Sequence, residues 1–215
     1  MHYNDIQANK FKTFRIFGTY NSISLLNDKN INQYFIDTTY KSVPKDLDNA
    51  KAILVIIGYN YTKDIFELIL VALLSHEDTS ILIEFYNFII NTYNWEPKIL
   101  TFDFAKSNIN AIKEVFKNKN NIKLIPSFFH LLQSWWRKTS SLGLRKKRYI
   151  KDTKLMPYNL QLILFRSFET VKEFYSTIVE NIPKIKMFIK FPEYFEYTWF
   201  SINDSENTSI YEYSL

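Results

Sequence analysis

The stretch that most constrains the fold runs over residues 97–138, PKILTFDFAKSNINAIKEVFKNKNNIKLIPSFFHLLQSWWRK. It opens with the short apolar run Ile99–Phe102, which is typical of a strand buried on both faces. A second strand is predicted at Ile122–Ile125. Between the two segments, four apolar residues recur at helical spacing: Ile109, Ile112, Val115 and Phe116. The stretch therefore predicts a strand, a helix and a strand of an α/β sheet, in which ligand sites gather at the carboxyl ends of strands.

Two aspartates interrupt the predicted strands. Asp103 stands where the strand Ile99–Phe102 gives way to the helix, and Asp37 interrupts the β-prone segment Tyr34–Pro44. A carboxylate within a strand opposes β propensity, and such local conflicts tend to mark functional sites. The alternative is a helix-capping role for Asp103 and a solvated surface position for Asp37. We favour a functional pair of carboxylates.

Three consecutive strands are predicted upstream, at the Asp37 segment, at Ala52–Tyr61 and at Ile65–Leu74. Their simplest arrangement is an antiparallel meander, although periodicity alone does not exclude a helix at Ile65–Leu74. A helix is expected to start within His76–Ser80, where capping side chains and acids gather, and to run to about Tyr93. The expected order is three strands, a helix, a strand, a helix and a strand.

Outside this region the pattern is simpler. The first ten residues are polar and are expected to be frayed, and Lys12–Tyr20 with Ser22–Leu26 is predicted to form a short strand-like element. After His130 the pattern becomes helical. Further short helices are predicted at Leu160–Phe168, Val171–Val179 and Ile185–Phe191, punctuated by Pro157, Pro183 and Pro192. We therefore expect a core at residues 12–138, a helical segment at residues 139–200 and a flexible tail at residues 201–215.

Composition narrows the class of protein. The 215 residues are 47% hydrophobic and 18% aromatic, which allows a packed core and excludes wholesale disorder. The absence of Cys excludes disulfides and thiolate metal sites and fits an intracellular protein. The longest apolar runs, Ala52–Ile57 and Leu68–Leu74, are far shorter than the roughly 20 residues that span a bilayer, so no membrane association is expected.

The formal net charge of +5 favours a polyanionic partner. The basic residues gather in the second half of the chain, close to Trp135 and Trp136. The residues predicted to bind nucleic acid are Arg137, Lys138, Arg145, Lys146, Lys147 and Arg148, with Lys151 and Lys154 nearby. These cations would follow a phosphate backbone while the Trp rings stack on bases. The alternative is a solvated charged face.

Four segments of the chain resemble motifs of one family, the Mutator-like element transposases. IDTTYKSVP, which contains Asp37, resembles the family's first-acid segment, and ILTFDFAKSNINAIKEVF, which contains Asp103, resembles its second-acid segment. SFFHLLQSWWRK, which contains His130, is similar to the family's Cys-x-x-His element, and FPEYFEYTWF resembles a stretch late in its catalytic domain. The four segments follow the family's order and cover roughly Phe14 to Phe200.

The resemblance implies a ribonuclease H-like core: a three-strand antiparallel meander, helix, strand, helix and strand, followed by a mostly helical C-terminal segment. It implies phosphoryl transfer on DNA, with Asp37 and Asp103 as catalytic and metal-ligating residues and Mg²⁺ or Mn²⁺ as the cofactor. DNA would then be the partner, and no small-molecule substrate is expected. A transposase-like role implies a nuclear location, and self-association is left open.

Two departures from the family's pattern bear on activity. Ser127 stands at the position of the family's Cys, so His130 matches the motif without support for a zinc site, and a packed structural histidine is the alternative. The family's third acid, a Glu after Trp-Asn and Thr-Asn-Asn elements, has no convincing counterpart. The late acids that could substitute for it are Glu193, Glu196 and Glu206. We therefore expect a transposase domain that is truncated before the third acid and inactive.

Three hypotheses from different classes remain. The chain is an enzyme that cuts DNA with Mg²⁺ or Mn²⁺, a non-catalytic remnant that binds nucleic acid, or an interaction domain without a nucleic-acid role. A Trp-Asn and Thr-Asn-Asn-x-x-Glu stretch encoded farther along the gene would favour the enzyme.

Overall fold

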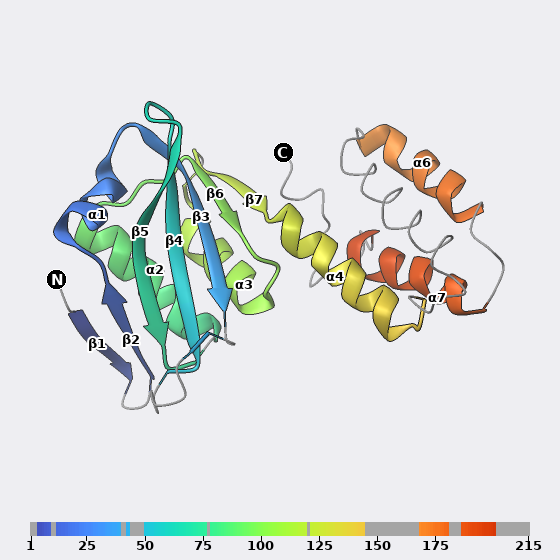
Figure 1. The fold of residues 1–215 in the computed structure, drawn as a ribbon, viewed down its shortest axis with the longest axis horizontal. Coiled ribbons are helices and arrows are strands. Elements are labelled where there is room, and N and C mark those ends of the chain that lie inside the picture. The colour runs from blue at the N-terminus through green and yellow to red at the C-terminus, as the bar shows by residue number, and fades with distance from the viewer. Residues whose placement is uncertain are drawn as a thin grey trace. The chain divides into compact units, whose positions relative to one another are not determined.

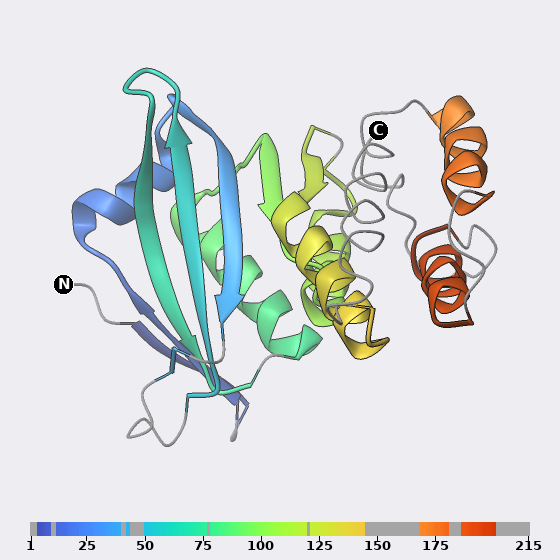
Figure 2. The ribbon, with the colours of Figure 1, turned by 45° about the vertical axis from the view of Figure 1, so that its right-hand side comes forward.

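A computed structural model describes residues 4–9, 12–39, 42–43, 50–76, 78–119, 121–144, 168–180 and 186–200. The chain divides into two compact units, Met1–Ser127 and Phe128–Leu215. The core was predicted from the sequence to end later, at residue 138. The first unit contains a sheet with helices, and the described part of the second unit is helical (Figures 1 and 2).

The first unit is built on a mixed sheet, which has seven strands in the described part of the chain. The strands are β1 (Asn4–Asn9), β2 (Lys12–Phe17), β3 (Ile31–Thr39), β4 (Ala52–Asn60), β5 (Ile65–Leu74), β6 (Ile99–Phe102) and β7 (Lys123–Pro126), in the spatial order β1-β2-β5-β4-β3-β6-β7. β3, β4 and β5 form an antiparallel meander, and β6 and β7 continue the sheet in parallel on the other side of β3. From β3 to β7 the predicted order of strands and helices is confirmed, and β5 is a strand rather than a helix.

Helices cover one face of this sheet. α2 (Thr79–Tyr93) and α3 (Lys106–Phe116) lie side by side behind the strands, and the short α1 (Tyr20–Ser24) lies near β5 (Figures 1 and 2). Alternate side chains of β4 are buried along the whole strand, which is the pattern of a strand with one face on the core. The core beneath the helices contains Tyr34, Ile36, Leu54, Ile56, Phe85, Ile89, Leu100 and Phe102.

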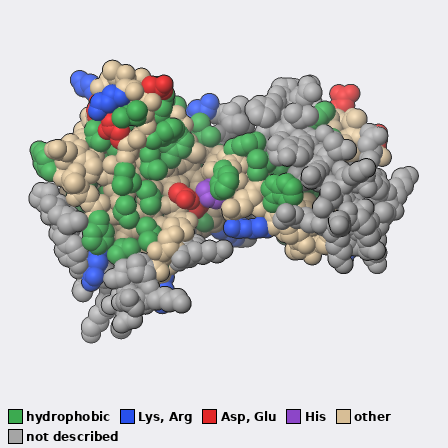
Figure 3. Space-filling model, in the orientation of Figure 1, with side chains coloured by type: hydrophobic (Ala, Val, Ile, Leu, Met, Phe, Trp, Pro, Cys, Tyr) green, Lys and Arg blue, Asp and Glu red, His purple; other side chains and the backbone are tan. Residues whose placement is uncertain are grey.

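The opposite face of the meander carries a group of large apolar side chains. Phe66 is 64% exposed and Leu68 is 55% exposed. Phe66 also contacts the rings of Phe35, at 5.5 Å between centroids, and Tyr59, at 5.0 Å. Figure 3 shows hydrophobic side chains gathered over these strands. Among the described residues of the first unit, helices thus cover one face of the sheet.

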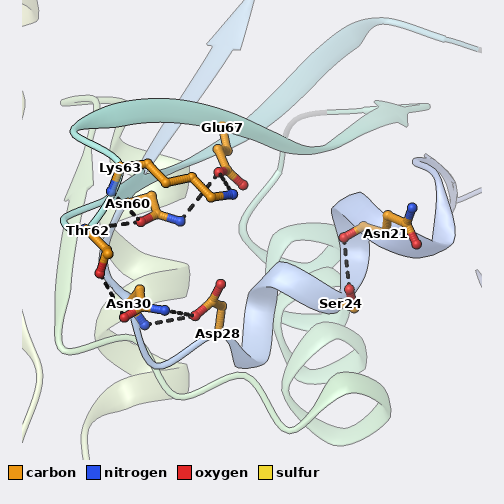
Figure 4. A network of polar contacts seen from close by, with 8 residues as sticks. All are labelled: Asn21, Ser24, Asp28, Asn30, Asn60, Thr62, Lys63 and Glu67. Carbon is orange, nitrogen blue, oxygen red and sulfur yellow. Dashed lines mark hydrogen bonds and ion pairs between the residues drawn. The ribbon is translucent and has the colours of Figure 1, made fainter.

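A polar network fixes the turn between β4 and β5 to the start of β3 (Figure 4). The buried side-chain oxygen of Asn60 accepts hydrogen bonds from the backbone N–H groups of Thr62 and Lys63, each at 3.2 Å. The side-chain nitrogen of Asn60 donates to Glu67 at 3.3 Å, and the Thr62 hydroxyl donates to Asn30 at 2.9 Å. Buried polar groups are tolerated when they are hydrogen-bonded in this way.

The N-terminal region differs from the prediction in two respects. Residues expected to be frayed form β1, because they pair with β2 along the edge of the sheet, a tertiary interaction that polar composition does not reveal. Ser22–Leu26, expected to be strand-like, forms part of α1 and a following 3-10 turn. The Thr19 hydroxyl accepts the Ser22 N–H at 3.0 Å and the Ser22 hydroxyl accepts the Thr19 N–H at 2.9 Å. This capping box starts the helix.

The second unit contains α4 (Phe128–Ser141), α6 (Phe168–Glu180), α7 (Lys186–Phe195) and a π-helical turn at Glu196–Phe200. Pro192 lies inside α7, whereas it was expected to end that helix after Phe191. The buried rings of Phe191 and Phe195 flank Pro192, and the Tyr175 hydroxyl donates to its carbonyl oxygen at 3.2 Å. This packing offsets the hydrogen bond that Pro cannot donate. Most of the predicted helix Leu160–Phe168 and the predicted tail lie outside the described residues.

Candidate functional site

The register of the parallel strands brings Asp37 and Asp103 to neighbouring positions. The last paired residues of β3 and β6 are Ile36 and Phe102. Asp37 is the next residue of β3, and Asp103 directly follows the end of β6. Adjacent strands lie about 4.8 Å apart, and the carboxyl ends of parallel strands meet at one edge of a sheet. The two aspartates therefore belong to the same edge, although many residues separate them in the sequence.

Asp103 is the more enclosed of the two carboxylates, with only 7% of its surface exposed. Its Oδ1 accepts a hydrogen bond from the backbone N–H of Ala105 at 3.1 Å and another from the side-chain amide of Asn108 at 3.1 Å. Both donors are neutral, and no Lys or Arg forms an ion pair with Asp103 among the described residues. The hydrogen bond from Ala105, the N-cap residue of α3, agrees in part with the alternative that Asp103 helps to cap this helix.

Asn108 connects this carboxylate to a second helix. Asn108 lies in the first turn of α3 and is fully buried. Its side-chain oxygen accepts a hydrogen bond of 2.6 Å from the hydroxyl of Tyr86, a buried residue of α2. A continuous series of hydrogen bonds therefore runs from α2 through α3 to the end of β6.

Asn108 and Tyr86 were not predicted from the sequence, although the sequence contains a signal for one of them. Asn108, Ile112 and Phe116 recur at intervals of four residues, so Asn108 stands on the apolar face of the helix. An amide on such a face needs a hydrogen-bond partner when it is buried. The partner from α2 could not be identified, because no local pattern relates the two helices.

Asp37 lies on the exposed side of β3, and the pair of aspartates fits a divalent cation only in part. Carboxylate oxygens are the ligands that Mg²⁺ prefers, and Mg²⁺ binds few side chains and retains several waters. A buried carboxylate with neutral donors on one oxygen suits such an ion. However, no group of three or more His, Cys, Asp or Glu side chains that could hold a metal ion occurs in the described part of the chain.

His130 and the remaining predicted acids lie in the second unit or outside the described residues. His130 lies in α4, partly buried, with its ring edge-on to Phe129 at 5.4 Å. Glu193 and Glu196 are exposed in α7 and in the π-helical turn, and Glu206 lies outside the described residues. The backbone N–H of Ser127 donates to the Phe102 carbonyl at 2.7 Å, which is a structural role.

One part of the predicted nucleic-acid surface is wrong. Trp135 is fully buried and contacts the ring of Phe195 at 5.1 Å between centroids, so it cannot stack on a base. Arg137 is exposed on α4, while the Lys138 ammonium lies over the ring of Tyr194 at 4.6 Å. The other predicted cations lie outside the described residues: Arg145, Lys146, Lys147, Arg148, Lys151 and Lys154.

Comparisons with known proteins assign no family. The chain matches no protein-family model, and a search of curated proteins finds no significant relative. None of the described helices has the length and apolar character needed to cross a membrane. The fold and site therefore define an α/β domain with a mixed sheet and two carboxylates at one sheet edge.

Proposed function

We propose that the first unit is a ribonuclease H-like domain derived from a DNA strand transferase, similar to the Mutator-like element transposases, and that Asp37 and Asp103 form its residual divalent-cation site. The observation that carries this proposal is the register of β3 and β6, which makes the two aspartates neighbours at the carboxyl edge of the sheet. The order of the elements also supports it. An antiparallel meander is followed by two parallel strands on the far side of the first meander strand.

Two carboxylates do not suffice for the reaction. Divalent ions activate the attacking oxygen and stabilise the leaving oxygen in phosphoryl transfer, and this usually requires two ions held about 3.5–4 Å apart. Asp37 and Asp103, with water, provide ligands for one weakly held ion. Because the described residues offer no third acid at this edge, we propose that the 215-residue chain does not transfer DNA strands by itself.

A non-catalytic role in nucleic-acid binding is the second candidate. The net charge of +5 and the cluster of cations at Arg145–Arg148 favour it. In this role the chain would hold DNA through phosphate contacts of the second unit, with the cation site of the first unit as a relic of the ancestral activity.

The proposed function predicts the outcome of a strand-transfer assay. A pre-cut transposon end incubated with the chain and Mn²⁺ should give no joined product above background, because the second ion lacks a ligand set. The control is Asp103→Asn, which should give the same background. Robust joining by the unmodified chain that is lost in Asp103→Asn would contradict the proposal, and would show that another acid completes the site.

A further inference from the structure

We propose that Asn108 and Tyr86 are positioning residues for the cation site, because they hold Asp103 with one oxygen fixed and the other directed to a metal ion. This inference rests on the proposed function of the Asp37 and Asp103 pair. It concerns residues that do not touch the ion themselves and act only through the carboxylate of Asp103.

The Asn108 amide has a defined orientation between Tyr86 and Asp103. An Asn side chain has a donor end and an acceptor end, and both orientations occupy nearly the same volume. The Tyr86 hydroxyl lies 2.6 Å from Oδ1 of Asn108 and donates to it. This leaves Nδ2 directed to Asp103, at 3.1 Å. Without the Tyr86 hydroxyl, the oxygen of Asn108 would lose this hydrogen-bond partner, and the amide would be held at its Asp103 end only.

The two oxygens of Asp103 have different surroundings. Oδ1 receives both hydrogen bonds, from the Ala105 backbone and from Asn108. The hydrogen bonds that the described residues make to this carboxylate thus engage Oδ1 and leave Oδ2 to bind an ion. Ligating carboxylates are commonly held by such outer hydrogen bonds, which fix their orientation.

The burial of the series supports a functional role. Asn108 and Tyr86 are fully buried, and Asn108 stands among apolar residues of α3, where an aliphatic side chain would avoid the cost of burying an amide. The amide is satisfied here only because Asp103 and Tyr86 take up both of its ends. A role of the buried amide in orienting Asp103 would explain why the chain tolerates the cost of burying it.

The test measures Mn²⁺ affinity, with Mn²⁺ alone as the probe, by the electron paramagnetic resonance signal of the free ion. The variants are Asn108→Ala and Tyr86→Phe, which keeps the ring and removes only the hydroxyl. Asn110→Ala is the matched control, because Asn110 is an exposed amide on the same helix. Thermal unfolding of each protein without metal reports whether the fold is retained.

We expect Asn108→Ala to weaken Mn²⁺ binding roughly 10- to 100-fold, the usual effect of removing an outer hydrogen bond to a metal ligand. Tyr86→Phe should weaken it in the same direction, and Asn110→Ala should leave it unchanged. Unchanged Mn²⁺ affinity in folded Asn108→Ala or Tyr86→Phe overturns this inference alone. No binding by the wild-type chain overturns the proposed function together with it. If Asn108→Ala does not fold, Tyr86→Phe decides.

Discussion

Tyr34 places a hydroxyl group inside the core of the first unit. The hydroxyl donates to the carbonyl oxygens of Leu26 at 3.1 Å and Leu25 at 3.3 Å, and the ring meets Trp95 edge-on at 5.3 Å between centroids. Burial is the main cause that raises the pKa of Tyr34 far above that of an exposed tyrosine. The neutral form is therefore favoured by folding.

This shift predicts a loss of stability in alkali. A group whose pKa is raised by folding contributes its full stability below the unfolded pKa, which is about 10 for Tyr, and loses that contribution as the pH rises further. Tyr34→Phe cannot ionise, so the stability difference between wild type and Tyr34→Phe should shrink by about 1 kcal/mol between pH 8 and pH 11. Urea unfolding at the two pH values measures it.

The control for this measurement is Tyr20→Phe. Tyr20 is 72% exposed, so its removal should leave the pH dependence of stability unchanged. A difference between wild type and Tyr34→Phe that is the same at pH 8 and pH 11 would contradict the account of Tyr34.

At the same scale, the two aspartates were accessible from the sequence and their partners were not. Asp37 and Asp103 each conflict with the local preference of a predicted strand, and the strand order then relates them. Asn108 is a polar residue on the apolar face of its helix, but neither it nor Tyr86 reveals its partner in the sequence. Their roles depend on the packing of α2 against α3, which is set by tertiary contacts.

At the scale of elements, α2 shows how a local signal fixes a helix. The Asp78 side chain accepts the N–H of Ile81 at 3.0 Å, and the helix ends at Tyr93, before Asn94 in the left-handed conformation with φ 49°. Both ends agree with the prediction, because capping residues and the apolar stripe act within a few residues of each other.

The cap predicts a graded effect of substitution at position 78. Asp78→Ala should lower the free energy of unfolding by about 1 kcal/mol, because it removes an acceptor for an N-terminal N–H group. Asp78→Asn is the control and should change it by only a few tenths of a kcal/mol, since Asn caps equally well. Denaturant unfolding measures both. Equal losses in the two variants would indicate that charge rather than capping is responsible.

The elements that the sequence did not reveal depend on distant partners. β1 is mostly polar, with Ile6 and Ala8 as its apolar residues, and its pairing with β2 at the edge of the sheet defines it as a strand. Pro192 stays within α7 because aromatic packing and the bond from Tyr175 outweigh its local effect. Local propensity and periodicity therefore recover the central sheet and its two main helices better than the edges of the fold.

At the scale of the whole molecule, DNA binding should be weak, with little sequence preference and a strong dependence on salt. Reversal of Arg145, Lys146, Lys147 and Arg148 to Glu should abolish it, because these cations release counterions from the phosphate backbone. A charge-matched control reverses four exposed lysines of the described residues, Lys29, Lys51, Lys98 and Lys106. A fluorescence polarisation titration with duplex DNA at rising salt measures the affinity.

This prediction has a clear contrary outcome. Equal losses in the two quadruple variants would show that net charge alone governs binding, and the predicted cluster would then have no special role. Binding that does not change with salt would contradict phosphate contacts altogether.

The central claim is that Asp37 and Asp103 share one divalent cation at the carboxyl edge of the sheet. Isothermal titration of the 215-residue chain with Mn²⁺, compared with Asp37→Asn and Asp103→Asn, tests it most directly. The account predicts a single weak site in the wild-type chain that is lost in either variant, because each carboxylate supplies part of the ligand set. Mn²⁺ binding that survives both substitutions, or no binding by the wild-type chain, would contradict it.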